Sequence, residues 1–198
     1  AASDVYKRQV GGQDVAQTPL WELARTVGSV FQNPKSQFFN LDTTSEVLFG
    51  LESRGASHDE MAQALESAVQ VCGVGPLLER SIFALSGGEK QRISIARAIL
   101  KDAPIVVLDE ATAYADPENE EKMEAAIAEL VKDKTLVVIA HKLPAIMNAD
   151  QICVVDHGKL VAAGKHQDLI QSCPEYQKLW KAAQDSAEWK VHTAKEGN

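Results

Sequence analysis

Two uninterrupted apolar runs constrain the fold more than any other feature of the sequence. Ile105–Leu108 ends at Asp109, and Leu136–Ala140 ends at His141. Each run is short, rich in β-branched residues and apolar at every position, which is typical of a strand buried on both faces. An amphipathic helical pattern separates the two runs. The sequence therefore predicts an α/β fold in which helices cover both faces of a parallel sheet.

The other predicted elements extend this pattern. A β-like run precedes Gln32, and residues 43–84 lack strands and look like a helical insertion. Capping residues predict helix starts at the Ser57–Glu60 capping box and at Asp116 with Pro117. A hairpin turn is expected at Gly158. Two final helices are expected over 165–172 and 174–189.

Charge and cysteine content exclude several classes of protein. The chain carries 20 Lys and Arg against 28 Asp and Glu, a net charge of −8, which argues against bare nucleic acid as the main partner. Its three cysteines show no C-x-x-C spacing and suit a reducing compartment. No apolar run is long enough to span a membrane. We therefore expect a soluble, cytoplasmic protein without a nucleic-acid partner.

A glycine-rich helix start offers the first candidate site. Ser86 is the expected N-cap, and Gly87 and Gly88 occupy the first turn. Free N–H groups and the positive end of the helix are suited to an anion, and glycine lets a phosphate approach the backbone. Ser86 and Glu89 also have the spacing of a capping box, so a purely structural role is the alternative interpretation of these residues.

Polar residues follow the predicted strands and form the second candidate site. Asp109 and Glu110 end one buried strand, where ligands bind in open α/β sheets. One carboxylate could hold Mg²⁺ while its neighbour polarises an attacking water. His141 and Gln32 follow the other two strands. Each residue alone is also compatible with an ordinary solvated strand end; their order along the chain carries the argument.

This ordered set resembles the ATP-binding subunit of ABC transporters over roughly residues 10–182. The resemblance implies a P-loop NTPase-like (RecA-like) sheet with an inserted helical subdomain, ATP and Mg²⁺ as cofactors, and hydrolysis in a head-to-tail dimer. It also implies a transmembrane permease partner, a second ABC ATPase subunit (identical or different), and a place at the cytoplasmic face of the membrane. The segment after Gln32 would face the permease.

The resemblance assigns a role to each candidate residue. Leu85–Glu89 corresponds to the signature motif, so Ser86, Gly87 and Gly88 would contact the γ-phosphate of ATP held by the partner. The catalytic residues would be Glu110, acting on the attacking water, and His141, contacting the γ-phosphate. Asp109 would hold Mg²⁺, Gln32 would sense Mg²⁺ and the membrane domain, and Asp116 would be the D-loop aspartate.

The chain departs from the family at one essential point. No G-x-x-x-x-G-K-[ST] stretch, which would hold the phosphates, occurs in the sequence. We therefore expect a fragment that lacks the family's first strand and Walker A loop and has doubtful activity alone. The expected organisation is foreign or disordered residues over 1–9, an ATPase core over 10–42 and 85–190, a helical subdomain over 43–84, and a tail over 191–198.

Two other functions fit parts of the sequence. A soluble ABC-type ATPase of DNA maintenance shares the signature and the Asp-Glu strand, but such proteins carry long heptad helices, for which residues 43–84 are too short. A non-catalytic regulatory module fits the missing phosphate loop. The stretch around Gln32 resembles importers of the energy-coupling-factor kind, whereas the region after Ala140 resembles exporters, so the direction of transport stays open.

Overall fold

The computed structural model describes residues 8–109, 117–140 and 143–195. It comprises two compact units, Ala1–Ile139 and Ala140–Asn198. Each unit has a hydrophobic core of its own. The expected borders at 42/43 and 84/85 separate segments of the first unit, and they remain predictions.

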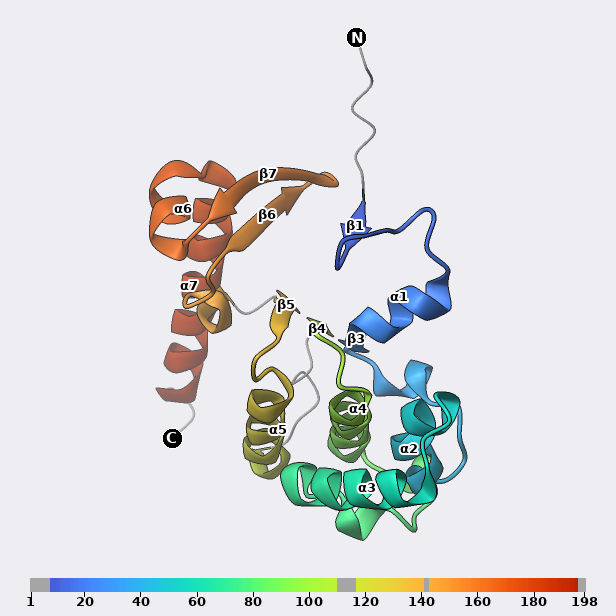
Figure 1. Cartoon of the computed structure of the whole chain (residues 1–198). Helices are drawn as coiled ribbons and strands as arrows, with labels where there is room; N and C mark the ends of the chain where they lie inside the picture. Colours follow the sequence, from blue (N-terminus) through green and yellow to red (C-terminus); the bar gives the residue numbers. More distant parts are fainter. Residues whose placement is uncertain (1–7, 110–116, 141–142, 196–198) are drawn as a thin grey trace. The chain divides into compact units, whose positions relative to one another are not determined.

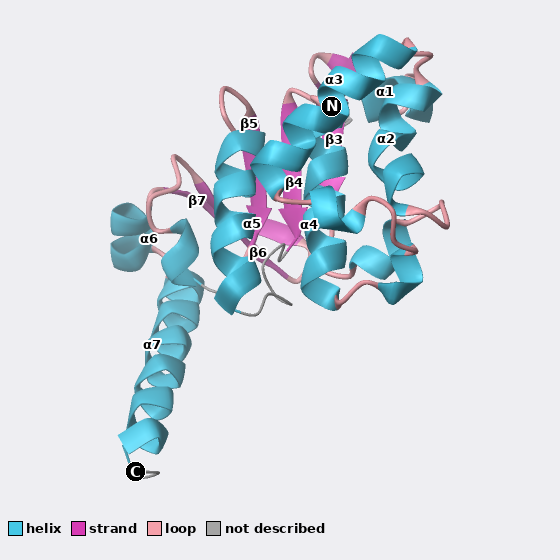
Figure 2. Cartoon of the chain, turned by 90° about the horizontal axis from the view of Figure 1, so that it is seen from below, coloured by secondary structure: helices cyan, strands magenta, loops and turns pink. Residues whose placement is uncertain are grey.

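A three-stranded parallel sheet organises the first unit. It contains β3 (Val27–Val30), β4 (Ile105–Asp109) and β5 (Thr135–Ile139), in the order β3-β4-β5. The register pairs Val30 with Leu108 and Asp109 with Ile139. Helices α4 (Gly87–Lys101) and α5 (Pro117–Leu130) lie against one face of this sheet (Figure 1, Figure 2). The predicted α/β fold with parallel strands is therefore confirmed.

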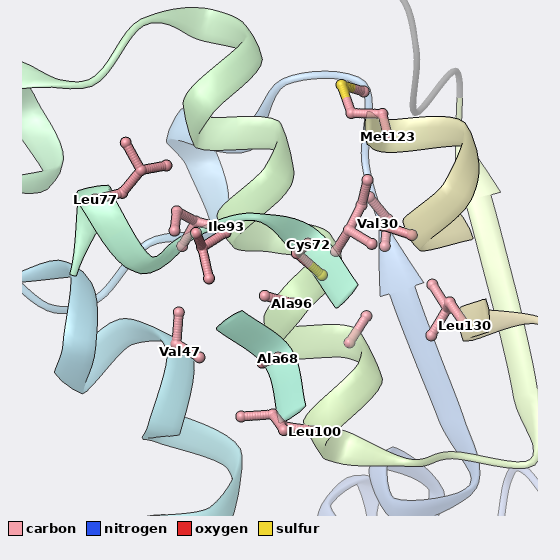
Figure 3. Close-up of a cluster of buried hydrophobic side chains, with 14 of the residues drawn as sticks. Val30, Val47, Ala68, Cys72, Leu77, Ile93, Ala96, Leu100, Met123 and Leu130 are labelled. Carbon is pink, nitrogen blue, oxygen red and sulfur yellow. The ribbon is translucent and has the colours of Figure 1, made fainter. Parts of the chain in front are cut away.

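Helices from the middle of the sequence complete the first core. They are α2 (Thr43–Ser53) and α3 (His58–Cys72), followed by the short 3₁₀ turns η2 (Gly75–Leu77) and η3 (Ile82–Ala84). The Ser57–Glu60 capping box is present at the start of α3. Figure 3 shows side chains from these helices packed with Ile93 and Ala96 of α4. Helix α4 therefore lies at the centre of this core.

Small elements at the beginning of the chain lead into the sheet. The strands β1 (Gln9–Val10) and β2 (Gln13–Asp14) form a hairpin, followed by α1 (Leu20–Thr26). The 3₁₀ turn η1 (Pro34–Gln37) then connects β3 to α2. The hairpin was not predicted, because two-residue strands leave no periodicity in a sequence.

One side of the sheet differs from expectation. All five residues of β5 are exposed, and Leu136, Val137, Val138 and Ile139 keep 40–49% of their surface in solvent. The uninterrupted apolar pattern predicted that β5 is buried on both faces. The described residues do not cover this strand in that way. β5 is the edge of its sheet, so it has a strand neighbour on one side only among those residues.

The second unit contains a hairpin and two helices. Its elements are η4 (Leu143–Ile146), β6 (Ile152–Asp156), β7 (Lys159–Gly164), α6 (His166–Ser172) and α7 (Pro174–Lys195). His157 and Gly158 both adopt positive φ in the tight turn between the strands. Tyr176 fills the core of this unit and bonds to Nδ1 of His166 at 2.8 Å. The predicted hairpin and both final helices are present.

None of the helices in the described part of the chain is both long and apolar enough to cross a bilayer.

Candidate functional site

The carboxyl ends of the three parallel strands form one edge of the sheet. Asp109 closes β4 beside Ile139, the last residue of β5. Gln32 lies two residues after β3 and is exposed. The register therefore brings Gln32 and Asp109 to the same edge, as the sequence predicted. Ligands of open α/β sheets bind outside this end of the strands.

Helix α4 presents the glycine-rich turn that the sequence singled out. Ser86 is its N-cap, and its hydroxyl accepts a bond from the Glu89 N–H at 3.2 Å, while Glu89 Oε2 accepts from the Ser86 N–H at 2.7 Å. The capping box predicted from Ser86 and Glu89 is therefore present. Ser86 and Gly87 are nevertheless exposed, and the N–H groups of a first helical turn have no partner inside the helix. Capping and anion binding are therefore compatible at this turn.

An arginine compensates the acid in this turn. Arg80 Nη1 lies 2.8 Å from Glu89 Oε1, and Arg80 Nη2 donates to the Ala84 carbonyl at 2.8 Å. The hydrogen bond from the Ser86 N–H is the main cause that lowers the pKa of Glu89, and the Arg80 guanidinium lowers this pKa further. Glu89 is therefore ionised at neutral pH, and Arg80 offsets a negative charge that would repel a phosphate.

The basic residues after the turn point into the protein instead of toward a ligand. Lys90 Nζ donates to the Leu85 carbonyl at 2.6 Å, and Arg92 Nη1 donates to the Gly73 carbonyl at 2.9 Å. Both side chains are buried. Their role is to hold the chain before α4 and the end of α3, so anion binding at this turn relies on backbone N–H groups.

Gln91 connects this helix to the sheet edge. Its side chain is 1% exposed, and Nε2 donates to the Phe31 carbonyl at 3.2 Å. Phe31 immediately precedes Gln32. Helix α4 and the residue before Gln32 are therefore joined by a direct hydrogen bond, which sequence reasoning missed because the two residues are 60 positions apart.

A buried ion pair fixes the segment that follows η1. Glu46 is fully buried and accepts bonds from the N–H groups of Phe39 and Asn40, both at 2.9 Å. Arg97 donates to the same carboxylate and, at 2.6 Å, to the Gln37 carbonyl. α4 is thereby tied to residues 37–40. No local sequence signal marks this pair.

A groove of about 950 Å³ is lined in part by Gln37 and Phe39 of that segment. α1, β3, η1, α2 and α4 all contribute to its lining. Phe39 and Phe49 stack with their ring centroids 5.3 Å apart. The groove lies in the first unit and includes Phe31, and Phe31 accepts a hydrogen bond from Gln91 of α4, the helix that begins at the glycine-rich turn.

The described residues fit Mg²⁺ only together with a phosphate. No cluster of three or more potential metal ligands occurs in residues 8–109, 117–140 and 143–195. Asp109 supplies one carboxylate at the sheet edge, and Mg²⁺ is usually bound by one or two carboxylates plus substrate phosphates and water. This donor set is therefore compatible with an ion carried by a nucleotide.

The structure describes some of the predicted site residues and not others. Gln32, Ser86, Gly87, Gly88 and Asp109 are described, and the contacts above connect the turn at Ser86 to the end of β3. Glu110, Asp116 and His141 lie outside the described residues. Their expected roles remain predictions.

Comparison with known proteins agrees with this arrangement. The sequence profile of the ABC transporter family matches residues 5–113. The "Mycobactin import ATP-binding/permease protein IrtA" of Mycolicibacterium thermoresistibile is 40% identical over 190 residues, which is 90% of this chain and 20% of that protein. The "Energy-coupling factor transporter ATP-binding protein EcfA1" of Ligilactobacillus salivarius is 34% identical over 165 residues, covering 82% of this chain and 58% of that protein.

A solved structure extends the likeness to three dimensions. A bacterial Atm1-family ABC exporter with ATP bound superimposes with a TM-score of 0.70 and 29% identity, over 86% of this chain and 30% of that one. This chain spans about a fifth of the length of the mycobactin import proteins it matches. The profile covers more than half of the chain, and the fold and the sheet edge agree with it. The chain therefore belongs to the ABC transporter family and corresponds to that family's nucleotide-binding domain.

Proposed function

We propose that this chain is an ATP-hydrolysing component of an ABC transporter and acts as half of a head-to-tail pair of ATPase domains. Family membership supports ATP as the nucleotide. The observation that carries the proposal is the bond from Gln91 to the Phe31 carbonyl. It ties α4, the helix that begins at the exposed turn of Ser86, to the residue before Gln32 at the sheet edge.

The signature turn would serve a nucleotide held by the partner subunit. The exposed Ser86 and the first-turn N–H groups of α4 would bind the γ-phosphate, while Arg80 offsets the charge of Glu89. On this chain's own edge, Asp109 would hold Mg²⁺ and Gln32 would lie beside it. Glu110 would orient the attacking water and His141 would contact the γ-phosphate. Positioning and charge stabilisation would supply most of the rate gain.

The groove supports a permease partner at the cytoplasmic face of the membrane. It is lined by exposed aromatic residues, including Trp21 and Phe39, which are 63% and 74% exposed. Concave apolar surfaces of this kind accept helices from partner proteins. The Glu46–Arg97 pair joins one wall of the groove to α4. Occupation of the groove would thus be communicated to the signature turn.

Two serines provide a matched test. Ser57 and Ser86 cap α3 and α4 with the same capping-box geometry. Replacing either by Ala should cost about 1 kcal/mol of stability. In the assembled transporter, Ser86→Ala should lower the kcat for ATP hydrolysis by at least about tenfold, whereas Ser57→Ala should leave it unchanged. Equal kcat values for the two variants would contradict the proposed role of Ser86.

The isolated chain and the catalytic carboxylate give two further tests. Without a phosphate loop in its sequence, the 198-residue chain should bind ATP weakly or not at all; micromolar affinity in equilibrium dialysis would contradict this. In the assembled transporter, Glu110→Gln should abolish turnover while ATP binding persists. Retained hydrolysis would assign the water-activating role to another residue.

A further inference from the structure

Arg80 joins the start of α2 to the turn that precedes α4. Its main-chain carbonyl accepts bonds from the Thr43 N–H at 3.3 Å and from the Thr43 hydroxyl at 2.8 Å. Thr43 is fully buried and is the first residue of α2. The guanidinium of Arg80 donates to the Ala84 carbonyl and pairs with Glu89. The side chain therefore acts on the turn from a backbone position that is fixed to another helix.

The turn before α4 is held by two different cations. Lys90 is buried, and its Nζ donates to the Leu85 carbonyl at 2.6 Å. Arg80 is exposed, and its Nη2 donates to the preceding carbonyl, that of Ala84, at 2.8 Å. The N-cap Ser86 follows these two carbonyls directly. Both bonds therefore orient the first N–H groups of α4.

Glu89 places a negative charge in the same turn. Glu89 is ionised at neutral pH, because the hydrogen bond from the Ser86 N–H, and then the Arg80 guanidinium, lower its pKa. Among the described residues, Arg80 is the cation that pairs with Glu89. Like charges a few ångströms apart repel strongly where water is partly excluded. Without Arg80, this carboxylate would therefore oppose the approach of a phosphate.

An exposed ion pair alone contributes little, and Arg80 differs from such a pair in two respects. Its guanidinium donates to two acceptors, Glu89 and the Ala84 carbonyl, in a fork that an ammonium group does not reproduce. Its backbone is also fixed, because the neighbouring Ser81 forms a β-bridge with Asp42. The position of the guanidinium is therefore set before any ligand arrives.

We propose that Arg80 is a positioning residue for ATP hydrolysis, which orients the turn at Ser86 toward the γ-phosphate and cancels the charge of Glu89. It acts through Glu89 and the Ala84 carbonyl. This inference rests on the proposed function and adds the means by which the turn is kept ready for a phosphate. Substitution separates the two effects, because Arg80→Lys keeps the charge and loses the fork, whereas Arg80→Gln loses both.

Steady-state ATPase kinetics of the assembled transporter measure the two effects. Arg80→Gln leaves Glu89 unpaired, so we expect KM for ATP to rise at least about fivefold and kcat to fall at least about threefold. Arg80→Lys should keep KM within about twofold of wild type and lower kcat. The double variant Arg80→Gln/Glu89→Gln carries neither charge, and its KM should return to within about twofold of wild type. The KM defect of Arg80→Gln should also shrink in high salt.

Lys134→Gln is the matched control. It removes the cation of an ion pair at the other end of α4, where Asp102 is the C-cap, and it should leave KM and kcat unchanged. Hydrogen exchange of the 198-residue chain, followed by mass spectrometry, gives a readout independent of activity. Arg80→Gln should increase exchange over residues 84–92, whereas Lys134→Gln should not.

Two outcomes would overturn the inference. If Arg80→Gln changes neither KM nor kcat, its ion pair is a surface contact without a role in hydrolysis. If the double variant keeps the high KM of Arg80→Gln and both have the same lowered urea midpoint, Arg80 supports the fold and not the charge balance of the turn.

The serine variants keep this inference distinct from the proposed function. A loss of kcat in Ser86→Ala, with no change in Arg80→Gln, would overturn the role of Arg80 alone. Equal kcat values for Ser57→Ala and Ser86→Ala would remove the role of the turn, and the role of Arg80 with it.

Discussion

The side-chain amide of Gln91 donates to the main-chain carbonyl of Phe31 at 3.2 Å. Gln91 is 1% exposed and belongs to the helix that begins at the signature turn. Phe31 follows the strand β3 and also lines the groove. One part-buried hydrogen bond therefore joins the helix that begins at the proposed nucleotide-facing turn to the surface that would face a permease.

Removing this bond should weaken the first unit. Gln91→Leu keeps the approximate volume but leaves the Phe31 carbonyl without its donor, so we expect a loss of about 1–3 kcal/mol in the free energy of unfolding. Urea denaturation followed by tyrosine and tryptophan fluorescence measures it. Gln91→Glu should be worse near neutral pH, because an ionised carboxylate cannot donate to a carbonyl. An unchanged urea midpoint in both variants would show that the bond contributes nothing.

The Glu46–Arg97 pair should show strong energetic coupling. Glu46→Gln leaves the Arg97 charge without its counterion, and we expect a destabilisation of about 3–5 kcal/mol, as for other buried pairs that lose one member. A double-mutant cycle with Arg97→Met should give a coupling energy of about 0.5–3 kcal/mol.

The Lys134–Asp102 pair is the control for that cycle. The Asp102 side chain is 77% exposed, so Asp102→Asn should cost less than about 1 kcal/mol. Asparagine also tolerates the positive φ of 51° at this position. Equal losses for Glu46→Gln, which removes a buried carboxylate, and Asp102→Asn, which removes an exposed one, would contradict the importance given to Glu46.

Stability should depend on pH through Glu89. Its folded-state pKa lies below the ordinary value of 4.5, because the ionised form accepts the Ser86 N–H and faces Arg80. A carboxyl with a lowered folded-state pKa contributes stability above its unfolded-state pKa and loses it as the pH falls through the folded-state pKa. Glu89→Gln retains the capping geometry and removes the charge. The difference in unfolding free energy between wild type and variant should therefore be largest near pH 7 and shrink below about pH 4.

The two hydrophobic cores should respond separately to cavities. Ile93 is fully buried in the first core, and Leu169 is 3% exposed in the second. Replacing either by Ala should cost about 2–5 kcal/mol. Hydrogen exchange followed by mass spectrometry should show lost protection in Ala1–Ile139 for Ile93→Ala and in Ala140–Asn198 for Leu169→Ala. Lost protection throughout the chain for either variant would mean that the units unfold together.

The sequence predicted elements whose signals are local. β4 and β5 were placed to within one residue, because an apolar run flanked by polar residues marks both ends of a strand. The capping boxes at Ser57 and Ser86 were predicted and are present, since each involves residues three positions apart. The family resemblance depended on the order of such local motifs, and the comparisons confirm it.

The sequence did not reveal contacts between distant positions. Glu46 and Arg97 are separated by 51 residues, and nothing near either one indicates that both are buried. Lys90 and Arg92 are buried, and each donates a hydrogen bond to a backbone carbonyl that the sequence does not indicate. The groove also depends on the packing of five separate elements, so no single segment could have predicted it.

The bare edge of β5 has a practical consequence. In the described part of the chain, β5 carries four neighbouring apolar side chains and a row of backbone groups without a second strand beside them, which form a template for intermolecular pairing. Purified on its own, the chain should therefore self-associate as its concentration rises, and light scattering would detect the onset. A polypeptide that adds a strand beside Thr135–Ile139 should keep the chain in solution. Solution turbidity can therefore be used to screen for such a binding partner.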